Sequence, residues 1–166
     1  MDVTGPTKHT VKMPDGSVVN RYYDELDTPR PESYRQDVET SKASKEDPKA
    51  IFRNLRSAAE SGWDFSSRWF ADGENITTIA TTDLIPVDLN CLLYHLELTL
   101  AKAFKIRGDV AKNDLTHAKE FEAKAEQRKN AINQYCWSDA ASWYVDCTTK
   151  GELGQELTLA GVTPLF

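Results

Sequence analysis

Two long segments with helical periodicity constrain the fold of this chain more than any other feature. The first runs from Pro86 to about Arg107 and the second from about Ala111 to Tyr135, with a break at Gly108-Asp109 between them. Apolar residues recur at helical spacing, at 89, 92, 93, 96, 100 and 104 in the first and at 118, 121, 125 and 132 in the second. The other faces of the second segment carry mixed charges. This pattern predicts an antiparallel helix hairpin.

Shorter elements are expected before this hairpin. Val11 to Val19 contains the turn dipeptide Asp15-Gly16 between β-prone arms and predicts a small β-hairpin. Pro31 to about Lys42 predicts one helix. A second helix is expected from Pro48, with Asp47 as its cap, to a C-terminal glycine at Gly62.

Residues 61 to 69 read Ser-Gly-Trp-Asp-Phe-Ser-Ser-Arg-Trp and place Asp64 between two aromatic rings just past a helix end. Trp63 and Phe65 could exclude water from Asp64 and so favour its protonated form, which a proton donor needs. Gly62 would let a ligand approach the backbone closely. The structural alternative is that Asp64 caps the next helical turn.

Arg30 stands between Pro29 and Pro31, which limit the directions its guanidinium can take. A fork aimed in this way suits recognition of a polyol or carboxylate. Glu32 could complement the start of the following helix. The alternative for Arg30 is an ion pair with a local carboxylate such as Asp27.

Together these stretches resemble a known family. Asn20-Arg-Tyr-Tyr-Asp24, Thr28-Pro-Arg-Pro-Glu-Ser-Tyr34, the run from Ser61 to Trp69, and Thr81-Thr-Asp-Leu-Ile-Pro-Val-Asp-Leu-Asn90 occur in the order and approximate spacing seen in α,α-trehalases. The resemblance extends from about His9 to the C-terminus and implies an all-α fold, part of an α/α toroid of six helix hairpins, to which the small N-terminal β-hairpin is added.

The resemblance also implies a function. It indicates hydrolysis of α,α-trehalose to two glucoses by an inverting mechanism, with Asp64 as general acid and with Arg30, Glu32, Gly62 and Trp63 as sugar-binding positions. Neither a metal nor an organic cofactor is expected. A periplasmic or secreted location is favoured over a cytoplasmic one by the resemblance alone.

Several family features have no counterpart in this sequence. An upstream Pro-Gly-Gly-Arg-Phe stretch, a downstream Gln-Trp-Asp stretch and the glutamate that serves as general base are not found. Residues 1–166 are therefore expected to be a partial catalytic domain, truncated at both ends, that needs the remainder of that domain as its partner and is inactive alone. Two alternatives remain: an inactive carbohydrate-binding or structural fragment, and another toroid glycosidase of the glucoamylase type.

Composition narrows the choice of ligands. The chain is 40% hydrophobic and 28% charged, as expected of a globular protein, and its net charge of -6 argues against binding nucleic acid or anionic lipid. No membrane contact is expected. The three cysteines, Cys91, Cys136 and Cys147, lack the spacing of a zinc site and are read as small apolar residues, with pairing of Cys136 and Cys147 in an oxidising compartment as the alternative.

Three further residues have two possible roles. Asn90 could face a ligand or a hydrogen-bonded neighbour, and the structural role is favoured. Trp143 and Tyr144 lie in a stretch, 142–147, expected to be a short strand or extended loop. They could form a wall on which a sugar stacks, or they could pack internally.

Overall fold

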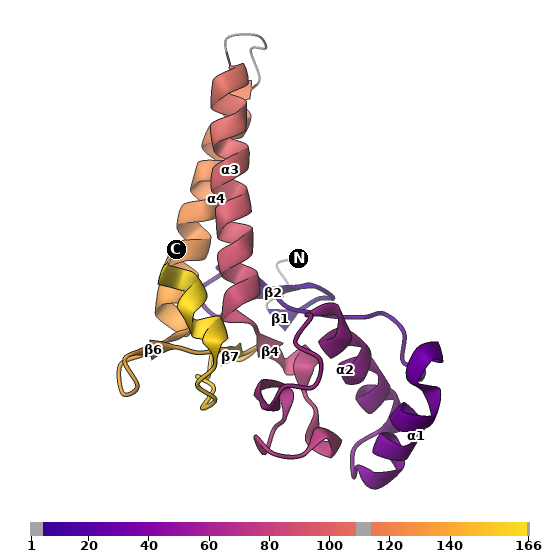
Figure 1. The fold of residues 1–166 in the computed structure, drawn as a ribbon. Coiled ribbons are helices and arrows are strands. Elements are labelled where there is room, and N and C mark those ends of the chain that lie inside the picture. Colours follow the sequence, from indigo (N-terminus) through magenta and orange to yellow (C-terminus); the bar gives the residue numbers. More distant parts are fainter. Residues whose placement is uncertain (1–4, 109–113, 166) are drawn as a thin grey trace.

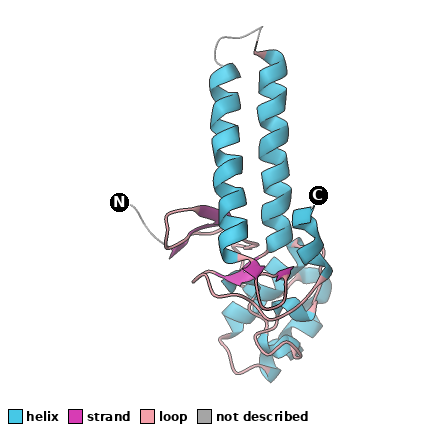
Figure 2. Ribbon diagram, turned by 90° about the vertical axis from the view of Figure 1, so that its left-hand side faces the viewer, coloured by secondary structure: helices cyan, strands magenta, loops and turns pink. Residues whose placement is uncertain are grey.

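The two long helices form a hairpin that projects from the rest of the molecule (Figure 1). A computed structural model describes residues 5–108 and 114–165. Helix α3 spans Val87–Arg107 and helix α4 spans Asp114–Tyr135. The two helices lie side by side in both views (Figure 2). The predicted hairpin is confirmed, although Asp109 and the expected start of the second helix at Ala111 lie outside the described residues.

Small buried residues let α3 and α4 approach closely. Ala101 of α3 and Ala118 and Ala125 of α4 are buried between them. Towards the tip, Phe104 stacks on Phe121 with 5.7 Å between ring centroids. Alanines and an aromatic pair therefore form part of the contact between the two helices.

A polar network joins the base of the hairpin to the N-terminal strands. The Asn90 side chain is fully buried; it accepts from the Asn20 backbone N–H at 2.9 Å and donates to the carbonyls of Asn20 and Pro86. Arg128 of α4 donates to the side chains of Asn90 and Asn20, and forms an ion pair with Glu97 of α3 at 2.9 Å. Asn90 therefore has the structural role that was favoured.

The N-terminal hairpin is larger than predicted. Strands β2 (Thr10–Lys12) and β3 (Val18–Asn20) pair antiparallel with Val11 opposite Val19. The turn contains Gly16, whose φ of 87° suits glycine. A third strand, β1 (Gly5–Pro6), pairs with β2.

Two more strand pairs lie near the base of the α3–α4 hairpin. Strand β4 (Leu84–Ile85) pairs antiparallel with β7 (Cys147–Thr148), and β5 (Trp137–Ser138) with β6 (Trp143–Tyr144). The chain is thus mostly helical with small antiparallel strand pairs. Residues 142–147, expected to be a short strand or extended loop, contain β6 and the first residue of β7.

Helices α1 (Tyr34–Ala43) and α2 (Pro48–Glu60) form a second, shorter pair beside the hairpin base. A 3-10 turn, η1 (Pro31–Ser33), precedes α1. The buried apolar residues of α2, Ile51, Leu55 and Ala58, pack with Trp69 and Ile79. Asp47 is the N-cap residue of α2 and Pro48 its first helical residue, as predicted, although the Asp47 side chain makes no capping hydrogen bond.

Short 3-10 turns connect the two helix pairs and end the chain: η2 (Ser67–Trp69), η3 (Ile76–Thr78), η4 (Thr81–Asp83) and η5 (Leu159–Leu165). The last packs on α3 and on β6. Trp143 donates its indole N–H to the Thr158 carbonyl at 3.1 Å and lies against Gly161, where an added Cβ would come within 2.2 Å of the indole nitrogen. Trp143 therefore packs internally.

Several leucines of α3 and of the C-terminal segment remain exposed. Leu92 on α3 is 62% exposed and Leu159 on η5 is 77% exposed. Leu96, Leu157 and Leu165 are also exposed. None of the described helices has both the length and the apolar character needed to cross a membrane.

Candidate active site

The loop from residue 61 to 66 joins the two hydrophobic cores of the molecule. Trp63 packs against both the core around α2 and the core around the base of the hairpin. Gly62 follows the end of α2 with φ of 72°, as predicted for a C-terminal glycine, and Phe65 has φ of 53°. A left-handed backbone at a phenylalanine is uncommon and persists only where the surroundings impose it.

Hydrogen bonds fix the shape of this loop. The Trp63 carbonyl accepts from the Ser66 N–H at 3.2 Å and from the Trp69 indole at 2.9 Å. The Trp63 N–H donates to the Ser61 hydroxyl at 2.9 Å. Ser66, not Asp64, caps the following turn by accepting from the Arg68 N–H. The structural alternative for Asp64 is therefore wrong.

Arg68 is buried between two aspartates from distant parts of the chain. It donates from Nε and Nη2 to Asp146 at 2.8 and 2.7 Å, and from Nη1 and Nη2 to Asp88 at 3.0 Å each. Its guanidinium also lies over the rings of Trp63 and Trp69, 4.9 and 4.4 Å from their centroids. The Val87 N–H donates to Asp146 at 2.9 Å, which ties the cluster to the start of α3.

Burial and the neighbouring charges shift the pKa values of Arg68 and Asp146. Burial lowers the pKa of Arg68, but the hydrogen bonds and negative charges of Asp88 and Asp146 outweigh it, so the pKa lies above its ordinary value. Burial raises the pKa of the Asp146 carboxyl, although Arg68 acts in the opposite direction. The Asp146 carboxyl therefore keeps its proton to a higher pH than an exposed aspartate would.

Arg30 lies on the other side of the loop. It donates from Nε and Nη2 to the two oxygens of buried Asp37 at 3.0 and 2.7 Å, and its backbone N–H donates to the same carboxylate at 2.9 Å. The guanidinium lies 4.8 Å from the centroid of Phe65. Arg30 is thus paired locally, but with Asp37 and not with the suggested Asp27, which lies 3.7 Å from Lys49 and Arg53.

Two of the predicted site residues, Glu32 and Asp64, lie close enough to Arg30 for their charges to act on it. The hydrogen bonds to Asp37 raise the pKa of Arg30 against the effect of burial, and the negative charges of Glu32 and Asp64 add to that increase. Glu32, Gly62 and Asp64 are exposed. An added Cβ at Gly62 would meet nothing within 4 Å, so open space lies beside the loop.

The expected shielding of Asp64 by its neighbours is wrong for this chain. Asp64 is exposed because the two flanking rings are used elsewhere: Phe65 lies against Arg30, and Trp63 lies against Arg68. The rings therefore hold the loop and leave the carboxylate facing outward.

One cavity has Arg68 in its wall. It has a volume of about 770 Å³ and is lined by residues 68–73, 80, 83–84, 146, 148–150 and 152–156. Neither Asp64 nor Arg30 is among its walls. Within the described ranges, no group of three metal-ligating side chains is found.

Sequence reasoning missed the residues that hold the loop in place. Arg68 stands four residues after Asp64, inside the run that was singled out, and Asp37 follows Arg30 by seven residues. Asp37 was within reach of a local search for charge pairs, whereas Asp88, the nearer partner of Arg68, lies 20 residues away from it. Asp146 lies 78 residues from Arg68 and has no local signal.

Comparison with known proteins agrees with these motifs. A family model described as Trehalase matches residues 3–166. The chain belongs to the trehalase family. It is 47% identical over 161 residues to proteins named periplasmic trehalase from Citrobacter koseri and from Xanthomonas oryzae pv. oryzae. Each match covers 96% of this trehalase-family chain but only 27% of the relative's length.

Proposed function

We propose that the protein to which this chain contributes hydrolyses α,α-trehalose to two glucose molecules with inversion at the anomeric carbon. The observation that carries the proposal is the presentation of Asp64. An exposed carboxylate stands on a loop whose two neighbouring aromatic side chains are each fixed by a buried arginine. A catalytic acid needs this combination of access and fixed position.

In the proposed mechanism, Asp64 donates its proton to the glycosidic oxygen as the bond to the anomeric carbon breaks. A second carboxylate activates water on the opposite face of the sugar, about 6.5–9.5 Å away in inverting enzymes. That base is supplied by the remainder of the catalytic domain. The chain alone is accordingly proposed to be inactive.

The sugar would lie in the open space beside Gly62. Arg30 is aimed by Asp37 and by the ring of Phe65, and it stands close enough to Glu32 and Asp64 for their charges to affect it. Arg30 and Glu32 are proposed to bind sugar hydroxyls, and Gly62 and Trp63 to border the sugar. Proton transfer and water attack require no metal or organic cofactor.

The remainder of the domain is the proposed partner. The α3–α4 hairpin and the α1–α2 pair are proposed to be two of the hairpins of an α/α toroid, in which the exposed leucines on α3 and η5 would be covered. The relatives' names support a periplasmic location.

Substitution of Asp64 in the complete enzyme tests the proposal. Asp64→Asn should lower turnover of trehalose by a factor on the order of 10² to 10⁴, with sugar binding nearly unchanged. The rate on α-glucosyl fluoride should largely recover, because fluoride leaves without a proton. Steady-state kinetics on both substrates provide the measurement.

Asp47→Asn is the matched control, since Asp47 is exposed and makes no capping hydrogen bond. It should leave both rates unchanged. Equal losses on the two substrates for Asp64→Asn would show that Asp64 binds sugar and is not the acid. If the complete enzyme binds trehalose without cleaving it, a carbohydrate-binding role would replace the catalytic one.

A further inference from the structure

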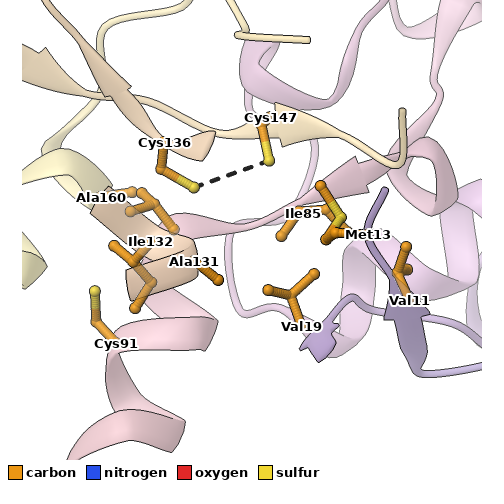
Figure 3. Close-up of a cluster of buried hydrophobic side chains, with 11 residues drawn as sticks. Val11, Met13, Val19, Ile85, Cys91, Ala131, Ile132, Cys136, Cys147 and Ala160 are labelled. Carbon is orange, nitrogen blue, oxygen red and sulfur yellow. Dashed lines mark hydrogen bonds between the residues drawn. The ribbon is translucent and has the colours of Figure 1, made fainter. Parts of the chain in front are cut away.

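Two of the three cysteines face one another in the core at the base of the helix hairpin. Cys136 follows the last residue of α4, and Cys147 begins β7. Their sulfur atoms are 3.9 Å apart, and the Cys136 thiol donates to the Cys147 sulfur. Figure 3 shows the two side chains pointing toward each other, with Cys91 set apart on α3.

The backbone around the pair is already fixed by other contacts. The Val145 N–H donates to the Cys136 carbonyl at 2.8 Å, and Cys147 pairs with Ile85 across β4 and β7. Cys136 is 2% exposed and Cys147 is fully buried. To reach the length of a disulfide bond, the two sulfur atoms must come about 2 Å closer together.

We propose that Cys136 and Cys147 form a structural disulfide when the protein folds in an oxidising compartment such as the periplasm. The two S–H bonds break and one S–S bond forms. The two electrons and two protons pass to a disulfide oxidant, a thiol-disulfide oxidoreductase or oxidised glutathione, which becomes two thiols. The described contact is the reduced form of this pair.

The bond would act on the Arg68 cluster. Cys147 directly follows Asp146, which binds Arg68 and the start of α3. A disulfide to the end of α4 would therefore fix Asp146 in place and constrain the intervening strands β5 and β6. This inference does not depend on the proposed chemistry at Asp64.

Because the two cysteines are buried, the disulfide should form more readily during folding than after it. The hydrogen bond to Cys147, together with burial, raises the pKa of the Cys136 thiol well above its ordinary value. The thiolate is the reactive form, so folded, reduced protein should oxidise slowly, whereas a folding chain should oxidise readily. Burial also raises the pKa of Cys91, to about 12, and its thiol should remain free.

Peptide mapping gives the direct test. Residues 130–150 lie between Lys129 and Lys150 with no other lysine or arginine, so one tryptic peptide contains both cysteines. The chain is refolded in a mixture of oxidised and reduced glutathione, its free thiols are blocked with N-ethylmaleimide in urea, and the peptides are weighed without reduction. The expected 130–150 peptide is two hydrogens lighter than its reduced form and carries no maleimide, while Cys91 carries one.

The same chain kept in urea throughout is the control for specificity. At the same glutathione ratio, we expect the ratio of disulfide-bonded to reduced 130–150 peptide to be at least about tenfold higher in the refolded chain than in the chain kept in urea. An equal or smaller ratio after refolding would overturn the proposal. So would a peptide carrying two maleimides, or pairing with Cys91.

Stability supplies a second readout within each variant. Reductant should lower the melting temperature of the oxidised chain by several degrees, on the order of 5 °C. Cys91→Ser should keep that difference. Cys136→Ala and Cys147→Ala should each abolish it whatever their own stability, and a difference that persists in either would contradict the assignment.

Discussion

Two buried arginines, Arg30 and Arg68, contact the loop that carries Asp64 through different aromatic side chains. Each lies over an aromatic ring of that loop, Arg30 over Phe65 and Arg68 over Trp63. Each is bound by carboxylate oxygens through its Nε and Nη atoms. The two arginines thus share one arrangement: a carboxylate fixes the guanidinium, and the guanidinium lies against an aromatic ring of the loop.

Their partners differ. The side chain of Arg68 is 1% exposed, and its hydrogen bonds go to Asp88 and Asp146, from two separate parts of the chain. The side chain of Arg30 is 9% exposed and binds one carboxylate seven residues away. Among the described residues, no hydrogen bond uses Arg30 Nη1. The comparison indicates that Arg68 organises the fold, whereas Arg30 keeps capacity to bind a ligand.

The largest effect should come from removing Arg68. Arg68→Met leaves Asp88 and Asp146 buried without their counter-charge, and should lower the free energy of unfolding by about 3–5 kcal/mol. Arg30→Met should cost less, because Asp37 keeps the hydrogen bond from the backbone N–H of residue 30. Urea denaturation of each variant measures the difference.

Arg35→Met serves as the control, since Arg35 is exposed and its ion pair among the described residues is with exposed Glu39 on α1. Its effect should stay within about 0.5 kcal/mol. If Arg30→Met proved as destabilising as Arg68→Met, the distinction between the two arginines would fail.

A smaller effect is expected at Gly62, where the loop leaves α2. Gly62→Ala meets no neighbouring atom within 4 Å, so its cost is the strain of a left-handed backbone, about 1 kcal/mol. Gly62→Asn should cost less, because asparagine tolerates this conformation better. Equal stability of the glycine and alanine forms would mean that the loop does not hold its positive φ.

The pH dependence of stability gives the smallest expected effect and tests the Arg68 cluster alone. Burial raises the pKa of Asp146 above its ordinary value of 3.8, so its contribution to stability is full below that value and declines as pH rises through the higher folded value. Asp146→Asn removes this decline. The difference in unfolding free energy should therefore shift in favour of the asparagine variant as pH rises, and a shift in the other direction would show that Arg68 outweighs burial.

The helices were predictable because their periodicity is a local property of the sequence. Residues 86–107 and 48–61 were recognised as helices from spacing, proline and glycine alone, and the turn at Asp15-Gly16 from its dipeptide. Strands β4 and β7 were not, because two-residue strands more than 60 positions apart carry no local pattern.

The candidate site residues were chosen from short motifs, and their surroundings in the fold could not be predicted from those motifs. Asp64, Arg30 and Gly62 were identified from short motifs, and the structure places them on one loop and its surroundings. The exposure of Asp64 was missed because a sequence does not show that the rings of Trp63 and Phe65 are each occupied by an arginine. Asp37 and Asp146 hold the two arginines in place by hydrogen bonds, and a short motif does not contain these partners.

Trehalose binding in the complete enzyme tests the distinction between the arginines most directly. In an Asp64→Asn background, which prevents turnover, Arg30→Lys should raise the Kd for trehalose about tenfold or more, because lysine keeps the charge but loses the fork. Its melting temperature should stay close to that of the parent. Arg68→Lys should lower the melting temperature markedly, yet bind trehalose within about twofold of the parent at temperatures where it is folded. An unchanged Kd for Arg30→Lys, or a weakened Kd for a fully stable Arg68→Lys, measured by calorimetry, would contradict the account.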